Sequence, residues 1–201
     1  MPTDRRGRRS LQIIVLFCNF NYVRRYNMNN QYPQRKNMRH PDFNYSNPGA
    51  CFLTICTKDK NCILSDIVKH DCEMYPKVAL TYYGKIAEKY INQLNDFYDD
   101  ICIKQYVIMP NHIHFILQIN RTIESNNFDA KHIPAVSSKI SLFVSTFKRF
   151  CNKEYGENIW QARSFDHVIR NEYDYAECAK YINNNPRKWY YSFNIDEEIR
   201  K

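Results

Sequence analysis

The stretch 106–117, YVIMPNHIHFIL, decides the fold of this chain. Two apolar runs flank Pro110 and Asn111. A proline followed by an asparagine is typical of a tight turn, because proline fixes φ and asparagine tolerates the unusual backbone that follows. The stretch therefore predicts a β-hairpin built from strands at 101–109 and 112–119.

Side chains along the second strand alternate between the two faces of a sheet, so His112 and His114 share one face. The opposite face is apolar and is expected in the core: Ile113, Phe115, Leu117 and Ile119. Two imidazoles one pleat apart can bind a divalent metal when a third group joins them. The pair alone leaves open whether the histidines bind metal or are satisfied core residues.

The segments around the hairpin alternate between strand and helix patterns. Residues 50–57 (ACFLTICT) are typical of a strand. Apolar and aromatic residues recur every four positions over 77–98 and predict a helix. Three further elements follow: a helix capped by Ser137 or Ser138 and reaching Cys151, a strand at 159–169, and a helix capped by Asn171 and ended by Pro186.

This element order predicts an α+β fold of the ferredoxin-like or RRM-like type. Such a fold has an antiparallel sheet with helices on one face, and the other face is expected to be open for a ligand. The last helix is an addition to this arrangement and carries Tyr181.

The composition indicates a globular protein with an anionic partner. The chain has 201 residues, 44% of them hydrophobic, and only 4 glycines. A net charge of +8 favours a polyanion, of which nucleic acid is the commonest. The 8 cysteines form no CxxC pair, so we expect reduced thiols in a cytoplasmic protein rather than disulfides or a zinc site.

The amino-terminal region differs in character from the rest of the chain. We expect residues 1–37 to be a basic, poorly ordered extension, 38–192 to be the main domain and 193–201 to be a tail. The apolar segment 11–18 (LQIIVLFC) follows the basic residues 5–9, but it is far shorter than the ~20 residues needed to span a bilayer. No membrane association is expected.

Tyr181 and Asn185 lie one turn apart on the last helix, so their side chains are neighbours. A phenol has a pKa of ~10 and is a weak nucleophile, but a cation on a scissile phosphate lets a poorly activated nucleophile suffice. The product would be a phosphotyrosine ester that conserves the bond energy for rejoining. Because the chain has 16 tyrosines, spacing alone leaves a packing role open.

Four blocks together resemble the REP-associated tyrosine transposases, IS200-like members of the single-tyrosine HUH transposase superfamily. The blocks are FNYSNPGACFLTICTKD (43–59), MPNHIHFIL (109–117), IWQARSFDHVIRNEYDY (159–175) and AKYINNNPRKW (179–189). They occur in the order and spacing of that family. The resemblance covers roughly residues 38–192.

The resemblance implies a role for each matching residue. His112 and His114 match the family's ligands for Mg²⁺ or Mn²⁺, and Asn185 matches the position that completes the metal site. Tyr181 matches the nucleophile that forms a 5′-phosphotyrosine link and leaves a free 3′-OH. The implied substrate is single-stranded hairpin DNA of the repetitive extragenic palindrome type, cleaved and rejoined by a cytoplasmic, nucleoid-associated monomer or homodimer.

Several basic residues are candidates for contacts with DNA phosphates. They are Lys148, Arg149, Arg163, Arg170 and Arg187. For Lys148 and Arg149, a solvated helix face is an equally good explanation.

Two other functions remain open. A catalytically silent protein of the same fold would bind hairpin DNA without forming a covalent adduct. An RNA-binding module would usually place aromatic residues where this strand has histidines, so it ranks last. If Tyr181 is not the nucleophile, Tyr173 and Tyr175 on the same helix are the alternatives.

Overall fold

The computed structural model of the protein describes residues 49–120 and 137–199, with side chains omitted for 137–138 and 193–199. The extension at 1–37 lies outside the described residues, as does the loop expected at 120–135 apart from Asn120.

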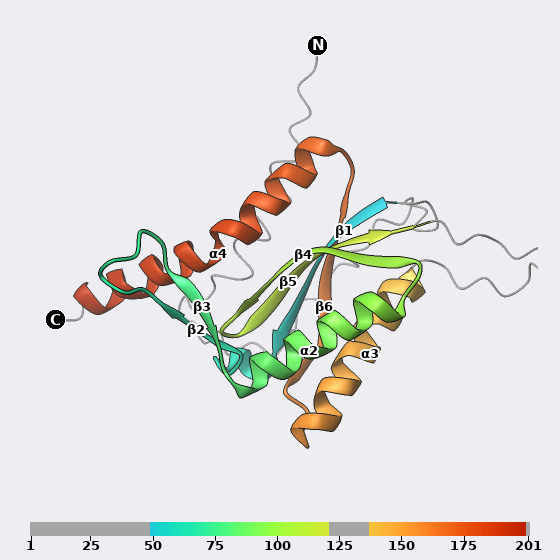
Figure 1. Cartoon of the computed structure of the whole chain (residues 1–201), viewed down its shortest axis with the longest axis horizontal. Helices are drawn as coiled ribbons and strands as arrows, with labels where there is room; N and C mark the ends of the chain where they lie inside the picture. Colours follow the sequence, from blue (N-terminus) through green and yellow to red (C-terminus); the bar gives the residue numbers. More distant parts are fainter. Residues whose placement is uncertain (1–48, 121–136, 200–201) are drawn as a thin grey trace, which may run out of the picture. The chain divides into compact units, whose positions relative to one another are not determined.

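A four-stranded antiparallel sheet forms the centre of the described part (Figure 1). Its strands are β1 (Gly49–Thr57), β4 (Ile101–Met109), β5 (His112–Ile119) and β6 (Trp160–Ile169). They lie in the order β4-β5-β1-β6, with every neighbouring pair antiparallel. The predicted hairpin and the ferredoxin-like sheet are therefore confirmed.

Two helices, α2 (Tyr82–Phe97) and α3 (Ser137–Tyr155), cover one face of this sheet. The core beneath them includes Leu53, Ile55, Ile91, Ile113, Phe115 and Phe147. The rings of Phe143 and Phe147 lie 5.9 and 6.0 Å from the ring of Phe115. The apolar face predicted for β5 is thus the core face.

The sequence predicted that the opposite face would be open, and this prediction is wrong. Helix α4 (Glu172–Ile199) packs on that face. The ring of Tyr181 lies 5.9 Å from Phe52 on β1. Gln105 of β4 donates a hydrogen bond of 2.7 Å to the side-chain oxygen of Asn183. The additional helix predicted to carry the tyrosine is present, and it occupies the face expected for a ligand.

Pro186 does not end α4, contrary to the sequence prediction. A proline inside a helix removes one backbone hydrogen bond and crowds the preceding turn. Here the helix continues because side chains on both sides of the proline pack on the rest of the molecule. Ile182 is buried, and the ring of Trp189 lies 6.0 Å from that of His112.

The sequence analysis missed a second, two-stranded sheet formed by β2 (Ser65–Val68) and β3 (Lys77–Leu80). A short 3₁₀ helix, Lys58–Lys60, precedes it. The helix predicted from residue 77 begins at Tyr82, because Thr81 caps it by accepting a hydrogen bond from the backbone N–H of Gly84. Residues 77–80 pair with β2 instead.

Replacement of Gly84, near the start of α2, should destabilise the fold. A Cβ at this buried position would collide with the backbone carbonyl oxygen of Leu64, which also accepts a hydrogen bond from the Thr81 N–H. We expect Gly84→Ala to lower the free energy of unfolding by about 1–3 kcal/mol, although alanine favours helix. Urea unfolding measures this difference. The exposed neighbour Lys85, changed to alanine, is the control, and an equal effect of both variants would contradict the packing explanation.

Candidate functional site

His112 and His114 lie side by side on β5, on the sheet face that α4 covers. Their ring centroids are 4.5 Å apart, and the exposed fractions of the two residues are 2% and 0%. Because β5 lies between β4 and β1, the sheet holds the strand from both sides. The spacing of the two rings is therefore fixed by the fold.

Each histidine is oriented by a hydrogen bond at Nδ1. The side-chain oxygen of Asn111 lies 2.7 Å from Nδ1 of His112, and the hydroxyl of Thr54 lies 2.9 Å from Nδ1 of His114. An amide oxygen only accepts hydrogen bonds, so Nδ1 of His112 carries the proton and Nε2 offers a lone pair. Among the described residues, this buried Nε2 has no hydrogen-bond partner. A buried polar atom without a partner is costly, and this one is suited to a cation.

Burial also holds both imidazoles in the neutral form. Burial, with the nearby charge of Lys60, lowers the pKa of His112 to about 3. Burial and then the neighbouring His112 hold the pKa of His114 well below its ordinary value. Neutral imidazole is the form that binds metal ions, so the pair is ready for a cation at neutral pH.

Helix α4 lays one stripe of side chains along this histidine pair. The ring of Tyr181 lies 5.2 Å from that of His114, and two turns later the ring of Trp189 lies 6.0 Å from that of His112. Asn185 is four residues from each of them on the same stripe and is 6% exposed. The fold thus brings Tyr181 to the histidine pair, with Asn185 on the same stripe of α4.

The composition of the site limits what a third ligand can be. The described residues contain no group of three or more His, Cys, Asp or Glu side chains that could hold a metal ion. Asn185, on the helix that faces the pair, is the predicted source of a third ligand from an amide oxygen.

A positive charge lies next to the candidate nucleophile. The Nζ atom of Lys188 is 5.4 Å from the centre of the Tyr181 ring. Lys188 itself is exposed, while Tyr181 is 9% exposed. An ammonium group in this position favours a phosphate beside the ring.

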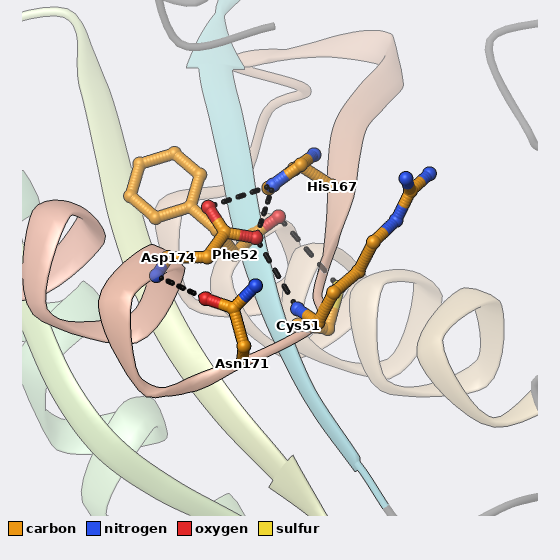
Figure 2. A network of polar contacts seen from close by, with 6 residues as sticks. Cys51, Phe52, His167, Asn171 and Asp174 are labelled. Carbon is orange, nitrogen blue, oxygen red and sulfur yellow. Dashed lines mark hydrogen bonds and ion pairs between the residues drawn. The ribbon is translucent and has the colours of Figure 1, made fainter. Parts of the chain in front are cut away.

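The amino-terminal end of α4 is fixed by a network of polar contacts (Figure 2). The side chain of Asn171 accepts a hydrogen bond of 2.8 Å from the backbone N–H of Asp174, as the predicted cap requires. The Asp174 carboxylate lies 3.0 Å from Nε2 of His167 on β6 and accepts a hydrogen bond from the Arg170 backbone N–H. The network joins β6 to the helix two turns before Tyr181.

The five basic residues predicted to contact DNA come from α3, β6, α4 and the turn before α4. Lys148 and Arg149 line a groove of about 720 Å³ between α3 and β6, which contains no residue of the histidine–tyrosine site. The ammonium of Lys148 donates a hydrogen bond of 2.7 Å to the backbone carbonyl of Gln161, so it is engaged within the fold. The other three candidates are exposed and lie on β6 or at α4: Arg163, Arg170 and Arg187.

Several contributors to the site were not identified from the sequence. Asn111 was assigned to the turn, although it also orients His112. Trp189 and Thr54 lie next to the histidines only because α4 and β1 pack against β5. The position of Asn111 directly before the histidine strand was a signal that could have revealed its second role.

Comparison with known proteins agrees with the sequence resemblance. No family model matches the chain. A putative REP-associated tyrosine transposase of Haemophilus influenzae is 31% identical over 110 residues, which are 49% of this chain and 60% of that protein. The chain thus spans less than two thirds of this relative. An uncharacterised protein of the same organism is 28% identical over 167 residues, covering 77% of this chain and 89% of that one.

Two solved structures were also found. One is a REP-associated tyrosine transposase bound to a REP hairpin, with a TM-score of 0.47, 22% identity, and coverage of 70% of this chain and 67% of that chain. The other is a putative transposase from Deinococcus radiodurans, with a TM-score of 0.38, 15% identity, and coverage of 69% and 91%.

The resemblance to REP-associated tyrosine transposases predicted from the four sequence blocks is therefore confirmed. The predicted α+β class is confirmed as well. Within the described residues, no helix has the length and apolar character needed to cross a membrane.

Asp174 should stabilise the fold in a pH-dependent way. Burial raises the pKa of its carboxyl, but the hydrogen bonds and charges of His167 and Arg170 together outweigh burial and hold the pKa below its ordinary value. A carboxyl with a depressed pKa contributes stability above its unfolded pKa of ~3.9 and loses it as the pH falls through the folded value. We expect Asp174→Asn to cost about 1–2 kcal/mol at neutral pH and progressively less in acid.

Urea unfolding of wild type and Asp174→Asn over a series of pH values measures this difference. The exposed Asp99, changed to asparagine, is the control and should show little effect. A cost that stays constant from neutral pH down to about pH 2, well below the ordinary carboxyl pKa, would contradict the assignment.

Proposed function

We propose that this protein is a metal-dependent transposase or endonuclease that acts on single-stranded hairpin DNA through a 5′-phosphotyrosine intermediate. The observation that carries the proposal is the contact of Tyr181 with a histidine pair whose member His112 has an unpartnered, buried Nε2. The sequence similarity to a putative REP-associated tyrosine transposase supports the same class of reaction.

The residues present fit a divalent cation. His112 and His114 supply neutral imidazoles, and Asn185 supplies an amide oxygen on the facing helix. Nitrogen ligands combined with an oxygen suit Mn²⁺, whereas Mg²⁺ prefers oxygen ligands alone. The hydrogen bonds at Nδ1 of both histidines fix the ring orientations, as outer partners of metal ligands do.

When bound, the cation would neutralise the scissile phosphate and polarise its P–O bond. The Tyr181 oxygen would attack phosphorus, forming the phosphotyrosine bond while the bond to the 3′ oxygen breaks. The phenolic proton passes to solvent, and the departing 3′ oxygen takes up a proton to become the 3′-OH. Lys188 would help to hold the phosphate near Tyr181, because its ammonium lies over the Tyr181 ring.

Hairpin DNA of the repetitive extragenic palindrome type is the proposed substrate. One structural relative is bound to a REP hairpin, which makes such hairpins the first oligonucleotides to test. The net charge of +8 suits a polyanion, and the exposed Arg170 and Arg187 lie at either end of the α4 segment that contains Tyr181. We place the protein in the cytoplasm at the nucleoid, as a monomer or homodimer.

One observation favours a second function, a catalytically silent DNA-binding protein. The two histidines are almost fully buried beneath α4, and Tyr181 on α4 is itself only 9% exposed, so a phosphate does not reach them in this arrangement. An active enzyme would need α4 to shift when DNA binds. A silent protein would keep the helix in place.

Tyr181→Phe separates the two functions. We incubate fluorescent hairpin oligonucleotides from the repeats flanking the gene with Mn²⁺ or Mg²⁺ and run denaturing gels. Wild type should give a denaturation-resistant protein–DNA band that Tyr181→Phe abolishes, while both proteins shift the hairpin equally on native gels. Tyr173→Phe and Tyr175→Phe are matched controls. A covalent band that persists in Tyr181→Phe would assign the nucleophile elsewhere, and native shifts without any band would establish the silent protein.

His112→Gln should weaken metal binding independently of catalysis. Loss of even an outer partner of a metal ligand typically lowers metal affinity about 10–100-fold, so loss of an imidazole ligand should cost about ten-fold or more. Isothermal titration calorimetry with Mn²⁺ measures the change directly. The exposed His70, also changed to glutamine, is the control and should bind like wild type. Equal Mn²⁺ affinity of all three proteins would refute the metal site.

A further inference from the structure

A small pocket lies beside the histidine–tyrosine site, between β2 and α4. Its volume is about 210 Å³, and Asp66, Pro110, Trp189 and Tyr190 contribute to its lining. No part of the proposed cleavage chemistry uses these side chains.

The pocket shares a wall with the candidate metal site. Trp189 lines the pocket, and its ring lies 6.0 Å from that of His112. Pro110, in the turn between β4 and β5, also lines the pocket and is two residues before His112. When α4 admits a phosphate to His112, a molecule in the pocket would lie beside that phosphate.

The size and lining of the pocket suit one planar aromatic ring system. Pockets for drug-sized ligands are larger, at roughly 300–1,000 Å³. Trp189 and Tyr190 offer aromatic faces, on which any nucleobase can stack. The exposed carboxylate of Asp66 is a hydrogen-bond acceptor for an exocyclic amine.

Positive charges lie where a DNA backbone would pass. Arg187 and Lys188 are exposed on α4 directly before Trp189. The charge of Lys60 also acts on His112. Cations around an aromatic pocket are the combination that binds single-stranded nucleic acid.

We propose that this pocket binds one unpaired nucleobase of the DNA strand, adjacent to the phosphate held at His112, with the base stacked on Trp189. The inference rests on the proposed function, because it takes DNA as the ligand. It adds a specificity site: the stacked base fixes the register of the strand, and Asp66 favours bases with an exocyclic amine, namely adenine, cytosine and guanine, over thymine.

The test is an abasic scan of a hairpin with a single-stranded flank. Each flank nucleotide is replaced in turn by an abasic site, and affinity is measured by fluorescence anisotropy in the Tyr181→Phe background, where no cleavage interferes. We expect one flank position at which loss of the base weakens binding about ten-fold. When Trp189→Leu is added to this background, an abasic site at that position should no longer weaken binding. With Trp189→Phe instead, most of the weakening should remain.

Tyr82→Leu is the matched control, since this exposed aromatic lies on α2 against the other sheet face. Asp66→Asn should reduce the preference against thymine at the sensitive position without changing the effect of the abasic site. An abasic profile identical in the Trp189→Leu and parent proteins, or no binding of any flanked hairpin, would overturn the pocket. Failure of the covalent-band assay alone would overturn cleavage and leave the pocket intact, because the scan reads only equilibrium binding.

Discussion

The packing of α4 across the centre of the sheet is the constraint on which the rest of the structure depends. It places Tyr181 against His114 and Trp189 against His112, and so it turns a strand with two histidines into an enclosed site. Two buried imidazoles are tolerated in the sheet because Asn111 and Thr54 each satisfy one nitrogen. The helix is held in this position by contacts to three different strands, through His167, Gln105 and Phe52.

Local chemistry made much of this arrangement predictable. The hairpin followed from one turn, Pro110-Asn111, and the shared face of the two histidines followed from strand alternation. The cap at Asn171 followed from an asparagine side chain that can accept a hydrogen bond from a backbone N–H in the first turn of the helix. In each case the forces act between residues close in sequence, so the sequence carries the information directly.

The unpredicted parts depend on contacts between distant residues. Residues 77–80 fit a helical repeat, but pairing with 65–68 makes them a strand. Pro186 stays inside α4 because tertiary packing outweighs one lost hydrogen bond. The same packing determines that a helix, rather than solvent, covers the histidine face. Periodicity and turn signals report none of these interactions.

Lys148 has a consequence for how copies of the chain can associate. Within the described residues β6 is an outer strand of the sheet, and outer strands offer unpaired backbone groups to other chains. The Lys148 ammonium lies 2.7 Å from the Gln161 carbonyl at the start of that strand and 3.4 Å from the carbonyls of Ala162 and Arg163. A second molecule that extended the sheet here would displace a cation from these carbonyl oxygens. We infer that Lys148 opposes intermolecular β-pairing at this end of β6.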